Sequence, residues 1–469
     1  MQSRGQKKQS GAQKEKRGKF HLGSGRILMF SFLFAILVGT GILMLPVSSA
    51  VGEQTDVVTA LFTATTSVCV TGLVVVDTYM HWSLFGKVVI LFLIQLGGLG
   101  IMTVSSMLML LAKKKFSMRD RILLYDAFNM DTHSGILSFL VAVFKGTFAV
   151  EGVGAILYSF ILVPQYGPKG IWYSIFTSIS AFCNAGIDIF GPDSLCAYRS
   201  DPAMLTVTML LVVLGGLGYV VWFDLYTSLK SGIGHGFSFS RMAAHWREHT
   251  KLVLMLTAVL LFGGALFILI LEYHNPDTIG AMGFGDKLLN SIFESVTLRT
   301  AGFVAIPQQN FSRATCILAY FLMFIGGSPV GTAGGVKTVT MFIVILNAVS
   351  FVRNRTETVV FSRRISENMM RKAAAIIAVS FGAVLAFETL LLATNDVAME
   401  DGLFEVVSAL ATVGLTRGLT PNLNTAGKLI IITCMYLGRI GPISMALFFT
   451  KVKPSKNSIS FAEGRFYVG

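Results

Sequence analysis

The stretch IFTSISAFCNAGI at residues 175–187 decides the fold, because three other stretches of the chain repeat its pattern. They are LFTATTSVCVTGL (61–73), IFESVTLRTAGF (292–303) and LFEVVSALATVGL (403–415). Each begins with an apolar residue and Phe, continues through a short run containing Ser or Thr, and ends in a glycine and an apolar residue. The glycines, Gly72, Gly186, Gly302 and Gly414, are 114, 116 and 112 residues apart. This regular spacing predicts four repeated structural units.

Long apolar runs surround these four stretches. Of the 469 residues, 53% are hydrophobic and 13% are charged, and the mean hydropathy is +0.68. A helix needs about 20 apolar residues to cross a bilayer. Eight runs reach about that length, at 26–46, 84–112, 136–163, 203–229, 252–271, 314–352, 373–393 and 426–449. We therefore expect an all-α polytopic membrane protein with eight transmembrane helices.

The second run of each unit contains a glycine cluster whose first glycine lies 24 to 29 residues after the repeated glycine. The clusters are LGGLG (96–100), LGGLG (214–218), IGGSP (325–329) and LGRIG (437–441). Each unit therefore predicts a membrane helix, a pore half-helix with a glycine turn, and a second membrane helix. Four parallel units of this kind would surround one central axis. We number them repeat 1 (26–112), repeat 2 (136–229), repeat 3 (251–352) and repeat 4 (370–450).

Charge predicts the orientation. Alternate loops and the two ends hold 27 of the 38 Lys and Arg residues, and such segments favour the cytoplasmic side. Both ends are therefore expected in the cytoplasm, with 1–25 a disordered basic tail and 451–469 a C-terminal tail. This topology explains the net charge of +13 without a nucleic-acid partner. Of the five cysteines, Cys183 and Cys196 would be able to pair on the outer side, although scattered thiols are more often apolar filler.

The short stretches predict a cation pathway. A half-helix of about 12 residues cannot span the bilayer, and the irregular backbone after it is tolerated where it lines a wet cavity. The carbonyl end of each half-helix favours a cation, glycine allows positive φ, and rings of carbonyls replace the hydration shell of potassium. With no carboxylate in these turns, calcium and magnesium are disfavoured. The predicted potassium filter comprises Val70, Thr71, Gly72, Leu73, Asn184, Ala185, Gly186, Ile187, Thr300, Ala301, Gly302, Phe303, Thr412, Val413, Gly414 and Leu415.

A second candidate site lies in the sixth run. Residues 326–335 contain five glycines and one proline, so a straight helix is not expected there. Arg439 lies within the last run, where a charge is costly unless it is paired or wet. We predict a flexible intramembrane loop (326–337) and a functional role for this arginine; a packing kink and a structural ion pair are the alternatives. The residues of this second site, which the resemblance described below identifies as a gate, are Gly326, Gly327, Ser328, Pro329, Gly331, Thr332, Gly334, Gly335, Lys337 and Arg439.

Three further charged residues lie within predicted spans or turns. Arg299 is expected to brace the third filter segment, against Glu294 or another acid of a pore half-helix. Interior pairing with Lys145 or Arg439 would explain why the acids Glu151 and Glu388 lie within spans. The sequence alone does not assign these pairs.

The motifs SVCVTGL (67–73), RTAGF (299–303) and GGSPVGTAGGVKT (326–338) resemble the superfamily of Trk, Ktr and plant high-affinity potassium transporters. The resemblance is nearest to the KtrB-type membrane subunits of bacterial Ktr potassium uptake systems, and it covers nearly all of the chain beyond residue 25. It implies a homodimer with one pore per subunit, a cytoplasmic ring of KtrA-like nucleotide-binding regulators, and stimulation by sodium. It also implies that the loop gates the pore and that Arg439 opposes cation passage.

The resemblance favours potassium, because some plant members carry serine at the position of Gly72 and select sodium. Uptake of potassium across the cytoplasmic membrane is therefore the leading hypothesis. An obligately coupled Na+/K+ or H+/K+ symporter and a TrkH-type subunit remain alternatives. An enzyme is not expected, since the chain has no paired carboxylate motif, HExxH or nucleophile elbow. No cofactor is expected in this chain beyond transported potassium, with sodium as an activator.

Overall fold

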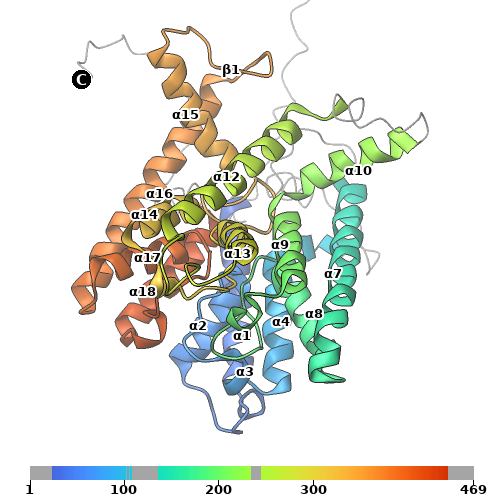
Figure 1. Cartoon of the computed structure of the whole chain (residues 1–469), viewed down its shortest axis with the longest axis vertical. Coiled ribbons are helices and arrows are strands. Elements are labelled where there is room, and N and C mark those ends of the chain that lie inside the picture. Colours follow the sequence, from blue (N-terminus) through green and yellow to red (C-terminus); the bar gives the residue numbers. More distant parts are fainter. Residues whose placement is uncertain (1–23, 102, 105, 108–135, 234–244, 442–469) are drawn as a thin grey trace, which may run out of the picture.

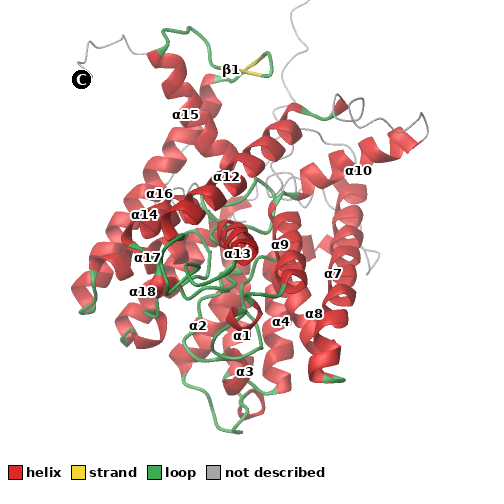
Figure 2. Cartoon of the chain, viewed as in Figure 1, coloured by secondary structure: helices red, strands yellow, loops and turns green. Residues whose placement is uncertain are grey.

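The computed structural model describes residues 24–107 except 102 and 105, together with residues 136–233 and 245–441. Predictions about the tails 1–23 and 451–469, and about the inner end of the last run at 442–449, lie outside these residues. The first helix begins at Ser24, two residues before the predicted start of repeat 1. The described chain is mostly helical, and β1 (Val359–Val360) and β2 (Arg363–Arg364) form a small antiparallel hairpin (Figure 2).

The helices follow the order of the four repeats (Figure 1). Repeat 1 contains α1 (Ser24–Leu43), α2 (Val57–Cys69), α3 (Thr78–His81) and α4 (Leu84–Leu99). Repeat 2 contains α7 (Ile136–Tyr166), α8 (Lys169–Phe182), α9 (Pro202–Gly216) and α10 (Tyr219–Ile233). Repeat 3 contains α12 (Glu248–Glu272), α13 (Phe284–Thr297), α14 (Arg313–Phe324) and α15 (Thr338–Val352). Repeat 4 contains α16 (Glu367–Thr394), α17 (Met399–Leu410) and α18 (Thr425–Ile440). Short 3-10 turns lie at Pro46–Ser48, Cys196–Tyr198, Gln308–Asn310 and Thr420–Asn422.

The four predicted half-helices are α2, α8, α13 and α17, and they are 12 to 14 residues long. Most of their residues are buried, including Phe62, Phe176, Phe293 and Phe404, the Phe of each repeated pattern. At about 1.5 Å per residue, none of them is long enough to cross a bilayer. They therefore lie inside the bundle, as the repeated sequence pattern predicts.

Neighbouring repeats pack in a closed order. The second helix of each repeat contacts the half-helix of the next: α4 contacts α8, α9 contacts α13, α14 contacts α17, and α18 contacts α2. Segments more than 350 residues apart therefore lie side by side where α18 meets α2. This order places the C-terminal ends of all four half-helices around a common centre.

The glycine clusters interrupt the second helix of every repeat. α4 ends before Gly100, α18 ends before Gly441, and both glycines have positive φ. α9 and α10 meet at a 98° bend next to Gly218, so α10 runs away from α9 (Figure 1). The run at 203–229 is therefore not one straight helix, and the break is not peculiar to repeat 3. Glycine permits these bends because it takes up positive φ without a steric penalty.

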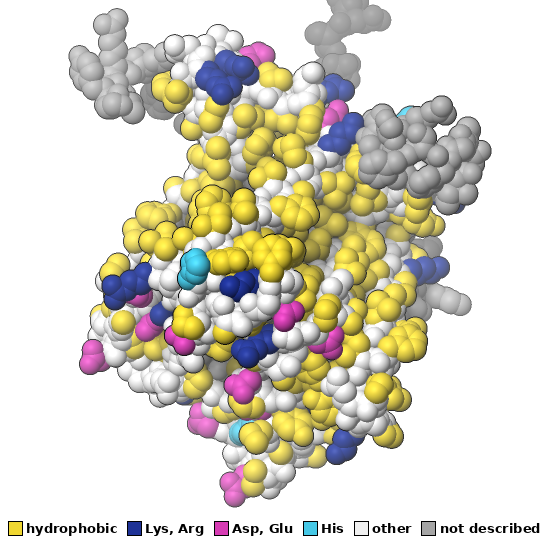
Figure 3. Space-filling model, in the orientation of Figure 1, with side chains coloured by type: hydrophobic (Ala, Val, Ile, Leu, Met, Phe, Trp, Pro, Cys, Tyr) yellow, Lys and Arg dark blue, Asp and Glu magenta, His cyan; other side chains and the backbone are white. Residues whose placement is uncertain are grey.

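Three helices in the described residues, α7, α12 and α16, are long and apolar enough to cross a membrane, and a fourth results if α9 and α10 count as one bent span. Eight spans therefore remain a prediction. Apolar side chains cover much of the face in Figure 3, and large ones such as Phe34, Phe160 and Phe262 are at least 68% exposed. So much exposed apolar surface is typical of a protein surrounded by lipid.

Candidate functional site

The four filter segments share one backbone conformation. Their first and third residues have positive φ in every repeat. The first residues are Val70, Asn184, Thr300 and Thr412, with φ between 51° and 67°, and the third are the repeated glycines. Positive φ is costly for β-branched residues such as Val and Thr, so the surrounding structure must hold them in place. The sequence predicted this conformation at the glycines but not at the first position.

The four glycines form a closed ring with the carbonyl groups of their neighbours. A Cβ atom on Gly72, Gly186 or Gly302 would lie 2.6 Å from a carbonyl oxygen of the following repeat, and one on Gly414 would overlap a carbonyl oxygen of repeat 1. The pairs are Gly72 with Ala185, Gly186 with Ala301, Gly302 with Val413, and Gly414 with Thr71. The filter segments of all four repeats therefore meet at one centre, where the carbonyl oxygen of each second residue lies against the glycine of the preceding repeat.

A set of hydroxyl residues behind the filter was missed in the sequence. Each half-helix carries a Ser or Thr four positions after the Phe of the repeated pattern, namely Thr66, Ser180, Thr297 and Ser408. The backbone carbonyl of each accepts a hydrogen bond of 2.8 to 3.0 Å from the N–H of the second filter residue of its repeat. The sequence did contain a signal for these residues, because all four lie at the same distance from the Phe of their repeat. Each hydroxyl also bonds the filter backbone.

The predicted loop lies in a break between α14 and α15. Gly326 N–H donates to the Val336 carbonyl at 3.0 Å, and Thr338 N–H donates to the Gly327 carbonyl at 3.1 Å. These bonds close the neck of the loop, so that its two ends lie together. Lys337 donates from Nζ to the Ala333 carbonyl at 2.7 Å, which bonds its charged group to the loop itself.

The body of the loop is bonded to repeat 2. Ser328 N–H donates to the Gly216 carbonyl at 3.1 Å, and Tyr219 N–H donates to the Val330 carbonyl at 2.9 Å. These bonds use the backbone groups that the bend between α9 and α10 leaves free. The bend and the loop therefore complete each other's hydrogen bonds.

The loop also touches two filter segments directly. Thr332 donates from Oγ1 toward Oδ1 of Asn184, 2.9 Å away, with the Phe182 carbonyl at 3.2 Å. On the other side, a Cβ atom on Gly334 would overlap the Thr412 hydroxyl. The loop therefore lies against the first filter residues of repeats 2 and 4.

Arg439 connects the loop to two other repeats. Its Nη1 donates to the Thr332 carbonyl at 2.6 Å, and its Nη2 donates to the Gly97 carbonyl. No ion pair of Arg439 occurs within the described residues, so the structural ion pair is not found there. The arginine thus lies where the sequence placed it, beside the loop, while its effect on cations remains a prediction.

Arg299 does not bond to Glu294, the partner suggested for it by the sequence. Arg299 donates from Nη2 to the Gly326 carbonyl at 3.3 Å, whereas Glu294 accepts from Nε2 of Gln308 at 2.9 Å. The arginine therefore braces the neck of the loop and not an acid.

Glu151 is bonded to neither Lys145 nor Arg439. It accepts from Nε2 of Gln95 at 3.0 and 3.2 Å, close to the thiol of Cys183, which is a free cysteine like Cys196. Glu388 is buried, and neither of its carboxylate oxygens has a hydrogen-bond partner in the described part of the chain. A single sequence gives no signal for the Gln95 contact, because that residue lies on a helix of another repeat.

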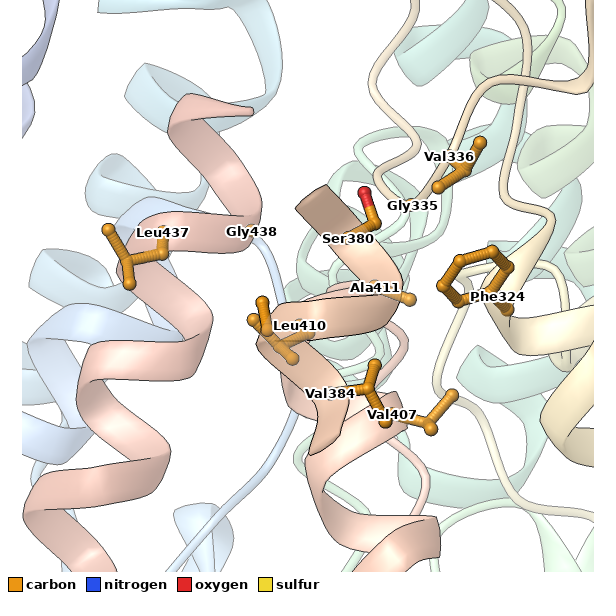
Figure 4. Close-up of a pocket in the computed structure, with 11 residues that line it drawn as sticks. Phe324, Gly335, Val336, Ser380, Val384, Val407, Leu410, Ala411, Leu437 and Gly438 are labelled. Atoms are coloured by element: carbon orange, nitrogen blue, oxygen red, sulfur yellow. The ribbon is translucent and has the colours of Figure 1, made fainter. Parts of the chain in front are cut away.

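A small cavity of about 40 Å³ lies on the side of the loop that faces repeat 4 (Figure 4). The loop contributes Gly335 and Val336, and α14 contributes Phe324. The other lining residues come from α16, from α17 with the Ala411 that follows it, and from α18. A cavity of this size holds only one or two water molecules, so the loop is not fully packed on this side.

Comparison with known proteins agrees with this geometry. The model of the TrkH family, described as a cation transport protein, matches residues 30–461. The chain is 37% identical to the potassium/sodium uptake protein NtpJ of Enterococcus hirae, over 95% of this chain and 97% of that protein. It is also 37% identical to the Ktr system potassium uptake protein B of Bacillus subtilis, over 95% and 96%.

A solved structure has the same fold. The potassium transporter TrkH from Vibrio parahaemolyticus superimposes with a TM-score of 0.71, covering 93% of this chain and 87% of that one, at 16% sequence identity. Identity this low supports the fold alone.

Proposed function

Because the chain belongs to the TrkH family of cation transport proteins, we propose that it takes up potassium through the centre of its four filter segments. The observation that carries this proposal is the closed ring in which each filter glycine lies against a carbonyl oxygen of the next repeat. Rings of backbone carbonyls are the ligands that replace the hydration shell of potassium. Any side chain at these positions would fill the space between the carbonyls.

The names of the relatives support potassium as the cargo. The Bacillus subtilis relative is named a potassium uptake protein of a Ktr system, and the Enterococcus hirae relative a potassium/sodium uptake protein. The second name favours one alternative, in which potassium moves only together with sodium. In the leading proposal sodium stimulates transport without being required for it.

The loop and Arg439 form the proposed gate. They lie directly beside the first filter residues, and the guanidinium carries a positive charge that would repel a cation leaving the filter. The hydrogen bonds between the loop, α18 and repeat 1 stabilise the arrangement in which the exit is covered. Opening would then require the loop to leave the Thr332–Asn184 and Thr332–Arg439 contacts together.

The remaining features of the proposal extend the family resemblance. They are eight membrane spans with both ends in the cytoplasm of a cell-membrane protein, a homodimer with one pore per subunit, and a cytoplasmic KtrA-like regulator that binds nucleotide. The name of the Bacillus subtilis relative supports a system of several components. Nucleotide sensing is assigned to the partner.

Tracer potassium uptake tests the proposal. The chain is expressed, with and without its regulator, in cells that lack their own potassium uptake systems, and uptake is measured at zero and at added sodium. Uptake at zero sodium that increases with sodium supports the leading proposal, and uptake strictly proportional to sodium entry supports a symporter. A membrane-inserted, dimeric protein that produces no potassium uptake in any condition would overturn both.

A further inference from the structure

The four hydroxyls behind the filter make two kinds of hydrogen bond. In repeats 1 and 4 they accept: Gly72 N–H donates to Oγ1 of Thr66 at 3.0 Å, and Gly414 N–H donates to Oγ of Ser408 at 3.1 Å. In repeats 2 and 3 they donate, and the acceptors are the carbonyl oxygens of the fourth filter residues. Ser180 donates to Ile187 at 2.5 Å and Thr297 donates to Phe303 at 2.6 Å.

The difference lies in the hydroxyls and not in the frame that holds them. The backbone carbonyl of each of the four residues bonds the second filter residue of its own repeat, five positions further on in repeats 1, 2 and 4 and four positions further on in repeat 3. A hydroxyl both donates and accepts, so Ser and Thr are able to hold either backbone group. The structure therefore combines a frame shared by all four repeats with side-chain bonds that differ between the adjacent repeats 2 and 3 and the adjacent repeats 1 and 4.

These bonds determine where two carbonyl groups point. A carbonyl that accepts from its own half-helix points back toward that helix, because the half-helix lies behind the filter segment. The carbonyls of Ile187 and Phe303 are therefore turned away from the centre. Among the described residues, no hydrogen bond reaches the carbonyls of Leu73 or Leu415.

We infer that the ring formed by the fourth filter residues is one-sided rather than fourfold. Ser180 and Thr297 hold the Ile187 and Phe303 carbonyls away from a passing ion, and only Leu73 and Leu415, which belong to the adjacent repeats 1 and 4, present carbonyls to it. The ring of the second residues, Thr71, Ala185, Ala301 and Val413, stays fourfold, since each of those carbonyls lies against the glycine of the preceding repeat. This inference rests on the proposed function and makes Ser180 and Thr297 positioning residues for selectivity.

The energetic consequence is a weaker ion site at the fourth position. Two carbonyl ligands replace less of a potassium hydration shell than four, so the ion keeps more of its water there. A site that binds weakly helps an ion to move on, since conduction requires binding that is not too tight. Releasing the two carbonyls should therefore tighten binding and slow transfer.

The test removes the two donors while keeping the shape of the side chains. The Ser180→Ala/Thr297→Val double variant should lower the KM for potassium uptake about five-fold, as expected for the net effect of one to two hydrogen bonds, with a lower maximal rate. Its K+/Na+ uptake ratio should change as well. Ser180→Thr and Thr297→Ser keep the donors and should restore the wild-type KM and ratio.

Matched controls use the other two repeats. Thr66→Val and Ser408→Ala remove acceptors of glycine N–H groups and leave the fourth carbonyls unchanged, so they should not lower the KM. A purely structural role for the hydroxyls predicts the same KM in all variants at reduced expression or stability. That result, or an equal fall of the KM in the controls, would overturn the inference.

Two checks keep the outcomes distinct. Each single variant, Ser180→Ala and Thr297→Val, is measured alongside the double variant, and a smaller shift of the same sign is expected from each. Size-exclusion profiles of the purified dimer confirm folding. If the wild-type chain takes up no potassium, the proposed function fails; if it does and the KM stays constant in the folded single variants, only the one-sided ring fails.

Discussion

The Nη1 atom of Arg439 lies 2.6 Å from the carbonyl oxygen of Thr332, which bonds the last described helix to the loop that interrupts repeat 3. The same guanidinium reaches the Gly97 carbonyl of repeat 1. Only a planar fork with several donors bridges two carbonyls in this way, and a lysine ammonium is a poor substitute. Removing this one side chain therefore frees the loop from two repeats at once.

Arg439→Ala should raise potassium flux about ten-fold, because a charge-assisted hydrogen bond that holds the loop closed contributes on the order of 1.5 kcal/mol. Tracer uptake into potassium-starved cells measures this. Arg439→Lys keeps the charge but not the bridge between the two carbonyls. Its potassium flux should lie between that of Arg439→Ala and that of the wild type. Unchanged or lower flux at normal expression would speak against a gate.

Deletion of residues 328–335 should raise flux further. The neck bonds between Gly326 and Val336 and between Thr338 and Gly327 lie at or beyond the ends of the deleted segment, so α14 and α15 can still be joined. A milder variant, Thr332→Val, removes only the hydroxyl bonded to Asn184 and Phe182. Potassium flux into vesicles should be highest for the deletion variant, lower for Thr332→Val and lowest for the wild type. The reversed order would contradict the prediction.

Gly72→Ser should weaken the preference for potassium over sodium. Its Cβ atom would lie 2.6 Å from the Ala185 carbonyl oxygen, and its φ of +104° strains any side chain. Gly52→Ser is the matched control, since Gly52 also has positive φ (+80°) but open space around it. Competition of sodium against tracer potassium measures the preference. Equal selectivity in both variants would show that Gly72 is not part of the filter.

Asp188 should make stability depend on pH. It follows the second filter segment, outside the helices, and burial raises its pKa to about 6, although Ser194 and the Phe190 N–H bond its ionised form. A raised pKa means that the folded protein binds the proton more tightly than the unfolded chain does. The stabilisation is therefore complete below about pH 4, the usual carboxyl range, and is lost as the pH rises through about 6.

Thermal unfolding of the purified protein between pH 4 and 7 checks this. The midpoint of the wild type should fall relative to that of Asp188→Asn between pH 4 and 6 and then stay constant. Parallel curves over the whole range would show that Asp188 does not titrate in this window.

The elements predicted well from the sequence are those in which the backbone conformation allows only one or a few residue types. The repeated glycines and the glycine-rich loop are of this kind, because positive φ and close approach leave few alternatives. The bend between α9 and α10 was missed although LGGLG stands there, since the apolar run at 203–229 continues through it without a polar signal. Apolar length alone does not distinguish a straight helix from one broken at glycine.

Side-chain partners were harder to predict, for a different reason. Glu151 bonds Gln95 and not a basic residue, and Arg299 bonds a carbonyl and not Glu294. Both contacts depend on which helices become neighbours after folding, and charge complementarity suggested the wrong partners. The opposite roles of Thr66 and Ser180 were equally hidden, because a hydroxyl accepts as readily as it donates.

The closed order of packing also bears on how the protein is made. Chains leave the ribosome from the N-terminus, and earlier units generally fold first. Here α2 receives its neighbour α18, and Thr71 its neighbour Gly414, only when the last repeat has been synthesised. Until then, the surface of α2 that contacts α18 in the folded protein has no partner. A chain truncated before the last repeat would keep that surface open, and it is the kind of surface that membrane quality-control proteases recognise.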